Sequence, residues 1–268
     1  MMKNTLATLF LLAAIPVAAQ QVNNQDRTLK CDDRSREDRS SERSCEMREY
    51  PLAASPKIIV DGGINGGMTI KGWDGSDMLV RAKVETWAPS AGEARSIASQ
   101  VNVLAAGGNI RSSAPEFGRD RGWAVSYEIF VPHRTGLNLK AHNGGIKISD
   151  VTGEIDFEAL NGGVSLARLG GAVKGKTTNG GLKIELTGTK WDGSELDVSA
   201  TNGGVSLEVP ENYSARFETS TVNGRVSVDF PISVQGRIDR QLSFNLGSGG
   251  SLIRAITTNG GVSVKRKS

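Results

Sequence analysis

The sequence contains few of the residue types on which most enzyme and metal sites depend. Among its 268 residues are two histidines and two cysteines. The cysteines form no C-x-x-C pair, and we interpret His133 and His142 as surface residues near strand ends. A zinc site therefore has little support. The chain also lacks a G-x-S-x-G nucleophile motif and a phosphate-binding P-loop, so we expect no catalytic residue, metal or cofactor.

Long apolar runs are equally scarce. The single clear run, from Leu6 to Val17, is too short for a membrane span, which needs about 20 apolar residues. Lys3 precedes this run and the small residues Val17-Ala18-Ala19 follow it. Residues 1–19 are therefore predicted to be a secretory signal peptide. We expect an exported protein, periplasmic or secreted at the cell envelope, without a transmembrane segment.

Neither sign of charge dominates. The 32 basic and 29 acidic side chains leave a formal net charge of +3. This balance predicts no strong attraction to nucleic acid or to anionic lipid. The 33 glycines, the 5% aromatic content and the scarcity of helix-favouring runs indicate an all-β chain with many turns.

Residues 20–50 are polar throughout. Seven basic and seven acidic side chains lie between Arg27 and Glu49, with almost no apolar ones. Such a segment buries too little surface to offset its ordering entropy, so we predict a charged flexible arm. Cys31 and Cys45 within it are predicted to form a disulfide, which would contribute roughly 3 kcal/mol by closing a loop of about 15 residues.

Residues 51–136 are typical of a β region. Stretches such as "KIIVDGG" and "AVSYEIFVP" alternate or run apolar in the manner of strands. One helix is predicted at residues 89–101, where Pro89-Ser90 can begin it. Ala94, Ile97 and Val101 would share one face, so this helix would cover a sheet or an open end of the fold.

Residues 137–268 consist of repeated units, each built around an Asn-Gly turn. Apolar residues stand three and five positions after every Asn, and another stands six positions before it. A weaker copy has its turn at Asn65. The turn residues are Asn143, Gly144, Asn161, Gly162, Asn179, Gly180, Asn202, Gly203, Asn223, Gly224, Asn259 and Gly260.

This spacing favours a parallel β-solenoid, a β-helix-like stack of coils of about 18 residues. In such a stack each position lies about 4.8 Å above its copy, so like residues pack on like. The alternative is an antiparallel β-sandwich, since Asn-Gly between alternating strands is also a strong hairpin signal. A sandwich would not explain why successive units keep the same residue class at the same positions.

The turn residues have their own explanation. Glycine is expected to supply positive φ angles, and stacked asparagines are expected to link amide to amide as a ladder. A calcium-binding roll has a coil of the same length, but it needs an Asp two residues after a Gly at each turn. The corresponding positions hold apolar residues such as Ile146 and Ile148. We therefore exclude calcium binding by the coil itself.

Two features could carry sugar chemistry. Asp156 and Glu158 would lie on one face about 7 Å apart, as a glycosidase pair requires. Lys174 and Lys176 occupy the matching positions of the next unit, which favours a ladder of opposite charges instead. Trp191 and Tyr213, in the inserts between units, are our candidates for a ligand-binding edge.

Several segments carry a resemblance to a known family. The signal peptide, "GGINGGMTIKGWDGSDMLVRAKVETWA", and the repeated "NGGV", "TTNGG" and "TVNGRVSVDFP" motifs resemble the putative-adhesin family of bacterial envelope proteins. The resemblance covers about residues 55–268. It implies a β-solenoid domain of the cell envelope, and the word adhesin in the family name says little about a ligand.

Three functions remain open from the sequence. The first is a non-catalytic exported solenoid that serves as an adhesin-like or scaffold surface. The second is a carbohydrate-binding or polysaccharide-active β-helix protein, and the third is a regulatory sensor of envelope stress. An envelope glycan or an envelope protein is the expected partner, and an uncapped solenoid end would allow self-association.

Overall fold

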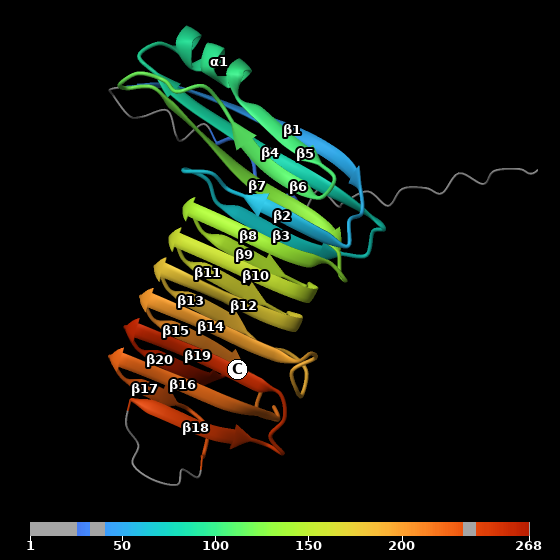
Figure 1. The fold of residues 1–268 in the computed structure, drawn as a ribbon, viewed down its shortest axis with the longest axis vertical. Helices are drawn as coiled ribbons and strands as arrows, with labels where there is room; N and C mark the ends of the chain where they lie inside the picture. Colours follow the sequence, from blue (N-terminus) through green and yellow to red (C-terminus); the bar gives the residue numbers. More distant parts are fainter. Residues whose placement is uncertain (1–25, 33–40, 233–239, 268) are drawn as a thin grey trace, which may run out of the picture.

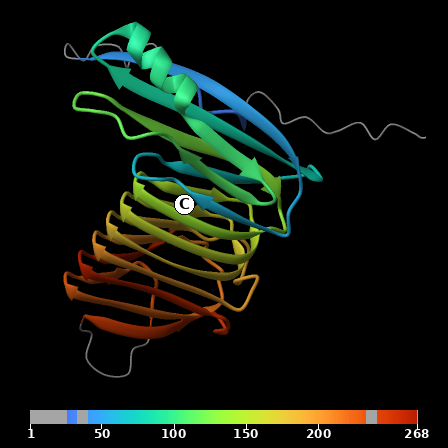
Figure 2. The ribbon, with the colours of Figure 1, turned by 45° about the horizontal axis from the view of Figure 1, so that its top comes forward.

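The computed structural model describes residues 26–32, 41–232 and 240–267. The segment predicted as a signal peptide, residues 1–19, lies outside the described residues. The described chain is all-β with one helix, and its strands form two ten-stranded sheets that are mostly parallel. The sheets face each other along the long axis of the molecule, with α1 beyond one end of the stack (Figures 1 and 2).

Each sheet takes one strand from every repeated unit. In spatial order, sheet A consists of β1 (Glu42–Ala53), β4 (Asp77–Ala88), β7 (Gly122–Pro132), β3 (Met68–Trp73), β9 (Ile146–Ser149), β11 (Val164–Ala167), β13 (Leu182–Glu185), β15 (Val205–Val209), β20 (Val262–Arg266) and β17 (Val226–Val228). Sheet B consists of β18 (Gln241–Leu246), β16 (Ala215–Asn223), β19 (Leu252–Asn259), β14 (Glu195–Asn202), β12 (Gly170–Asn179), β10 (Thr152–Asn161), β8 (Gly136–Asn143), β2 (Lys57–Asp61), β6 (Asn109–Ser113) and β5 (Asn102–Ala106).

Equivalent residues of neighbouring units lie beside each other in the repeat region. Val164 pairs in parallel with Ile146 on one side and with Leu182 on the other, and all three are buried. Burying each such side chain stabilises the folded state by roughly 1.5–3 kcal/mol relative to leaving it exposed to water. The units therefore form a solenoid-like stack, and an antiparallel sandwich does not describe them. The weaker copy at Asn65 joins the same stack, because β2 and β3 pair with β8 and β9.

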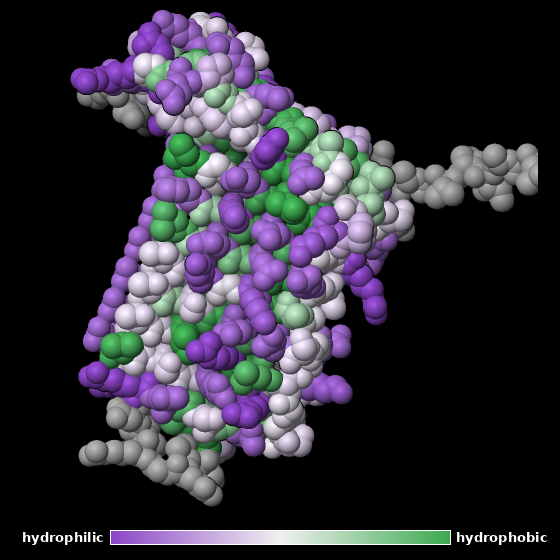
Figure 3. Space-filling view, viewed as in Figure 1, coloured by the Kyte–Doolittle hydropathy of each residue, from purple (hydrophilic) through white to green (hydrophobic). Residues whose placement is uncertain are grey.

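The asparagines of the turns form the amide ladder. From Asn143 onward, each Nδ2 group donates a hydrogen bond to Oδ1 of the asparagine before it in the stack, over 2.7–3.2 Å. The ladder runs through Asn65, Asn143, Asn161, Asn179, Asn202, Asn259 and Asn223. A regular hydrophilic column follows the edge of the molecule where the strand arrowheads end (Figures 1 and 3).

The turn glycines have a different cause from the predicted one. Of the six repeat-region glycines that follow the Asn, only Gly260 has a positive φ, at 150°. The shared reason is close approach, since a Cβ on Gly162 would collide with the carbonyl oxygen of Gly144. The other turn glycines meet a backbone carbonyl of the adjacent unit in the same way. Glycine is therefore required because the turns stack backbone against backbone.

The spatial order of the last units differs from their sequence order. The C-terminal coil, strands β19 and β20, lies between the β14–β15 unit and the β16–β17 unit. β18 pairs antiparallel with the outer edge of β16. Residues 252–266 therefore lie inside the stack and not at its end, where stacking in sequence order would place them. β17 and β18 form that end (Figure 1).

The N-terminal part is built differently. β4 pairs antiparallel with both β1 and β7, and β5 pairs antiparallel with β6. Helix α1 (Ala91–Gln100) lies inside the predicted range, and the Ser90 hydroxyl accepts a hydrogen bond from the Glu93 N–H at its start. Ala94, Ile97 and Ala98 are buried. None of the described helices is long and apolar enough to cross a membrane.

The predicted arm is largely part of the fold. Residues 42–50, expected to be flexible, belong to strand β1 at the edge of sheet A. Pairing with β4 satisfies the backbone, so the segment is ordered without a large apolar content. The predicted disulfide is confirmed, with the Cα atoms of Cys31 and Cys45 5.9 Å apart. Residues 20–25 and 33–40 of the arm lie outside the described residues.

A candidate binding groove on the outer face of sheet B

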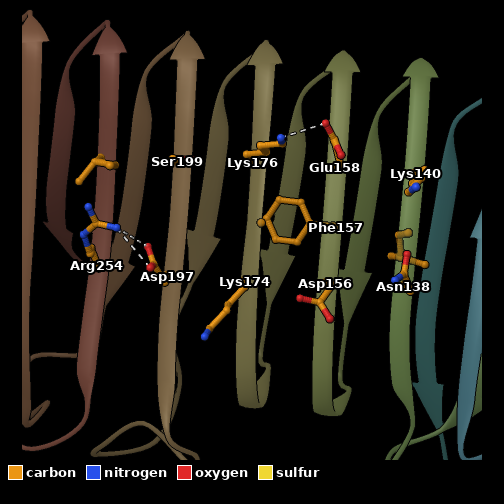
Figure 4. A pocket seen from close by; sticks show the side chains of 13 residues that line it. Asn138, Lys140, Asp156, Phe157, Glu158, Lys174, Lys176, Asp197, Ser199 and Arg254 are labelled. Atoms are coloured by element: carbon orange, nitrogen blue, oxygen red, sulfur yellow. Dashed lines mark hydrogen bonds and ion pairs between the residues drawn. The ribbon is translucent and has the colours of Figure 1, made fainter.

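The outer face of sheet B carries charges whose sign alternates from unit to unit. Because strands alternate their side chains, every second residue of β8, β10, β12, β14 and β19 points outward. Five residues before the ladder asparagines the face carries Asn138, Asp156, Lys174, Asp197 and Arg254, in spatial order. Figure 4 shows this row together with the row two residues further along each strand.

Most of these charges are paired across strands. Glu158 pairs with Lys176 at 3.1 Å, and Asp197 pairs with Arg254 at 3.1 Å (Figure 4). Lys174 pairs with Glu195 at 2.8 Å, and the hydrogen bond from this carboxylate raises the pKa of Lys174. The predicted charge ladder is therefore present. In a parallel, in-register stack of similar units, alternating sign keeps like charges apart.

The charged rows line a shallow open groove of about 530 Å³. The ring of Phe157 lies beside Gly175, where a Cβ would collide with the ring. Phe157 forms part of the floor but is only 4% exposed, so its ring is not a free stacking surface. The groove therefore offers ammonium, guanidinium, carboxylate and amide groups along a path that crosses five strands (Figure 4).

A second hollow of about 430 Å³ continues the groove toward β2. Lys140 and Glu158 line both, so the two form one surface. The second hollow has an apolar rim, since the side chains of Ile64 and Leu160 are 70% and 36% exposed. Figure 3 shows apolar patches among hydrophilic side chains on this face.

Asp156 and Glu158, for which the sequence favours a charge ladder over a glycosidase pair, lie close to lysine side chains. Asp156 and Glu158 both point to the outer face of β10 (Figure 4). Glu158 has its ion pair with Lys176, and Asp156 lies directly opposite Lys174. In the described part of the chain, no three His, Cys, Asp or Glu side chains gather as a metal site would require.

The predicted ligand edge is wrong, because both of its aromatic residues are buried. Trp191 is 5% exposed, and its Nε1–H donates to the Gly171 carbonyl at 3.0 Å. Tyr213 is 2% exposed, and burial raises its pKa. The inserts fold inward, so their large side chains complete the core at the end of each unit rather than facing a ligand.

The two histidines lie apart. His142 lines the second hollow beside the Asn ladder. His133 donates from Nδ1 to the Asp150 carbonyl at 2.7 Å, and its Nε2 lies 3.1 Å from Asp74 Oδ1. These acceptors, the Asp150 carbonyl first, raise the pKa of His133. Neither histidine faces a nucleophile in these contacts.

A buried charge cluster in the N-terminal part was missed by sequence reasoning. The Glu128 carboxylate is fully buried and accepts hydrogen bonds from the Thr28 N–H at 2.9 Å and from Lys71 at 2.9 Å. It also pairs with Arg81, which pairs in turn with Glu49. Burial alone would raise the pKa of Glu128, but the hydrogen bonds from Thr28 and Lys71 outweigh it and hold the pKa below its ordinary value.

Comparison with known proteins places the chain in a family. The model of the Toastrack DUF4097 family matches residues 90–265, more than half of the chain, so the protein belongs to this family. No curated protein matches it.

Solved structures give weaker likenesses. A putative cell adhesion protein from Clostridium sporogenes is 12% identical, with a TM-score of 0.42 over 83% of this chain and 100% of that chain. A putative adhesin from Bacteroides fragilis is 13% identical, with a TM-score of 0.41 over 84% and 97% of the two chains.

Proposed function

We propose that this protein is an exported, non-catalytic binding protein of the bacterial envelope, built as a β-solenoid with coils of about 18 residues. Its ligand-binding surface would be the groove on the outer face of sheet B. The Cys31–Cys45 disulfide supports an oxidising compartment, because such bonds persist outside the reducing cytosol. The balanced composition makes nucleic acid an unsuitable partner.

The observation that carries the proposal is the alternation of paired charges along an open groove. Carboxylates accept hydrogen bonds and ammonium groups donate them. The surface therefore offers hydrogen-bond acceptors and donors on neighbouring strands. A polyhydroxylated polymer such as an envelope glycan presents hydroxyl groups that do both. The groove is open rather than enclosed, which suits an extended chain bound along its length rather than a small molecule held in a pocket.

A glycan array tests this proposal. We expect wild-type protein to retain a subset of envelope glycans and the double variant Lys174→Ala/Lys176→Ala to lose them. Lys183→Ala is the matched control, because Lys183 is an exposed ion-paired lysine on the outer face of sheet A. Equal binding by all three proteins would overturn the assignment of the groove.

A second candidate function is polysaccharide cleavage, favoured by the two carboxylates on one face of β10. Under our proposal these carboxylates belong to the charge ladder instead, because Glu158 pairs with Lys176 and Asp156 lies opposite Lys174. A reducing-sugar assay on each retained glycan separates the functions. Turnover that disappears in Asp156→Asn would favour the enzyme, and the same assay gives no signal if the protein only binds.

A further inference from the structure

The C-terminal coil occupies a slot that the earlier part of the chain leaves open. β14 and β15 form one side of the slot, and β16 and β17 form the other. Among the described residues, β16 pairs with β18 and β19, and β17 pairs with β20. One further bridge, between Lys190 and Ser214, lies just before β16. Residues 252–266 therefore connect the end of the stack to its body.

The burial of the inward-facing residues does not explain why the C-terminal coil lies between the β14–β15 and β16–β17 units. Leu196, Phe217 and Ile253 hold the same position in their units, and all are buried and apolar. Burial of an apolar side chain at this position does not by itself select an order, although Phe217 also stacks on the ring of Phe244 in β18. The choice must come from side chains that differ between the units.

The outward-facing charges do distinguish the observed order of the units from stacking in sequence order. Arg254 lies directly between Asp197 and Glu218. If the units stacked in sequence order, these two carboxylates would be neighbours, and like charges directly opposite each other destabilise a sheet.

In sheet A, too, the C-terminal coil places a basic residue between acidic residues of the same two neighbouring units. In the strand register Lys265 lies opposite Glu208 on one side, and on the other side the Asp229 N–H donates to the carbonyl of Val264, the residue before Lys265. Sequence order would again bring the two acids together. β18 adds a steric reason, because it already covers the edge of β16 on which the next unit would otherwise stack.

The connection into the C-terminal coil has the properties of a hinge. β18 ends at Leu246 and β19 begins at Leu252, and three of the five intervening residues are glycine. Gly247, Gly249 and Gly250 all have positive φ, between 52° and 137°. Glycine adopts such angles with little steric cost, so the chain can change its path here at a lower conformational cost than at other residues, once the hydrogen bonds of Ser248 to Ser214 and of Ser251 to Gly193 are exchanged.

We propose that the slot between β14–β15 and β16–β17 accepts the C-terminal coil of a second copy of this chain, so that the protein forms dimers by exchanging residues 252–266. The incoming coil makes the contacts of the resident one. Asn259 completes the amide ladder between Asn202 and Asn223, and Arg254 separates Asp197 from Glu218. The partner is therefore specified by the same charges that set the order of the units.

Disulfide trapping between two different full-length variants tests the exchange. Ser199 and Ile256 are direct partners across β14 and β19, at a spacing that a disulfide can bridge. Ser199→Cys protein and Ile256→Cys protein are unfolded in urea with the native disulfide intact, mixed, refolded together and oxidised. We expect a disulfide-linked dimer whose amount rises with protein concentration and whose linked peptides contain positions 199 and 256.

A second pair of cysteine variants measures how much linked dimer forms without exchange of the C-terminal coil. Glu158 and Lys176 are direct partners on β10 and β12, inside the stack. Their Glu158→Cys and Lys176→Cys chains are treated identically, and we expect little linked dimer because these units are flanked on both sides within one chain. The single-chain double variant Ser199→Cys/Ile256→Cys must form the intramolecular bond, and its failure to do so would overturn the placement of the coil.

A charge reversal sharpens the result. Adding Arg254→Glu to the Ile256→Cys chain places a third acid between Asp197 and Glu218 in the closed monomer and in the exchanged dimer alike, so it should lower the yield of folded protein without changing the fraction of that protein in linked dimer. Arg254→Lys should preserve that yield. Linked dimer no greater than that of the Glu158→Cys and Lys176→Cys pair would overturn the exchange proposal.

Discussion

The two halves of the molecule solve the same folding problem by different means. In the repeat region, short parallel strands bury one apolar face, and polar groups lie on the surface or along the edge ladder. In the N-terminal part, long antiparallel strands of up to 12 residues surround a buried carboxylate with cations and backbone N–H groups. The repeat region relies on many equivalent contacts, whereas the N-terminal part relies on a few that differ from one another.

The largest effect is expected from the buried cluster. Glu128→Ala leaves Arg81 and Lys71 without their carboxylate in a buried setting, which should lower the free energy of unfolding by about 3–5 kcal/mol. Urea unfolding measures the change. The control is Glu158→Ala in the repeat region, whose half-exposed ion pair with Lys176 should contribute less than about 1 kcal/mol. Equal effects would remove the distinction between the two halves.

The repeat region should be most sensitive where its turns stack. Gly162→Ala places a Cβ against the Gly144 carbonyl and should cost about 1–3 kcal/mol through overpacking. Gly163→Ala, one residue later, would place its Cβ 3.5 Å from the Gly181 carbonyl, an ordinary contact, and should be far milder. Thermal unfolding of both variants compares them, and a reversed ranking would contradict the close-approach explanation.

The buried cluster should also contribute to the loss of stability in acid. The folded state lowers the pKa of Glu128 below its ordinary value of 4.5, so its contribution is complete above that value and is lost as the pH falls through the lower folded pKa. Wild type should therefore lose stability below about pH 4.5 faster than Glu128→Gln does. Unfolding curves measured from pH 7 to pH 3 check this expectation, and parallel curves for the two proteins would refute it.

The smallest effect is expected at the ladder. Asn161→Ala removes one hydrogen bond to Asn143 and one from Asn179 at an exposed edge, for a loss of about 1 kcal/mol. Asn138→Ala, on the same sheet but outside the ladder, serves as the control. Similar unfolding midpoints for the two variants would mean that the ladder contributes no stability.

The repeat region could be predicted from the sequence better than the N-terminal part, because its contacts follow a repeated local rule. The apolar positions around each Asn predicted which residues stack, because the rule is local and repeated. Glu128 follows Tyr127 in an alternating strand and looks like a solvent-facing residue, since nothing local indicates that Thr28 and Arg81 will cover it. Trp191 and Tyr213 were misassigned for a similar reason, as an insert gives no sign of whether it folds inward.

The order of the units was equally hidden. Apolar positions are interchangeable between units, so periodicity alone gives sequence order by default. The charges of Asp197, Glu218 and Arg254 contain the information, but it becomes readable only once their shared row is known.

Cross-strand nuclear Overhauser contacts test the central claim, that the C-terminal coil lies between the β14–β15 and β16–β17 units. Adjacent strands lie about 4.8 Å apart, so neighbours give direct contacts and second neighbours do not. The account predicts contacts from Ser206 to Ser263 and from Ser263 to Ser227, with none from Ser206 to Ser227. A direct contact between Ser206 and Ser227 would restore sequence order and contradict the account.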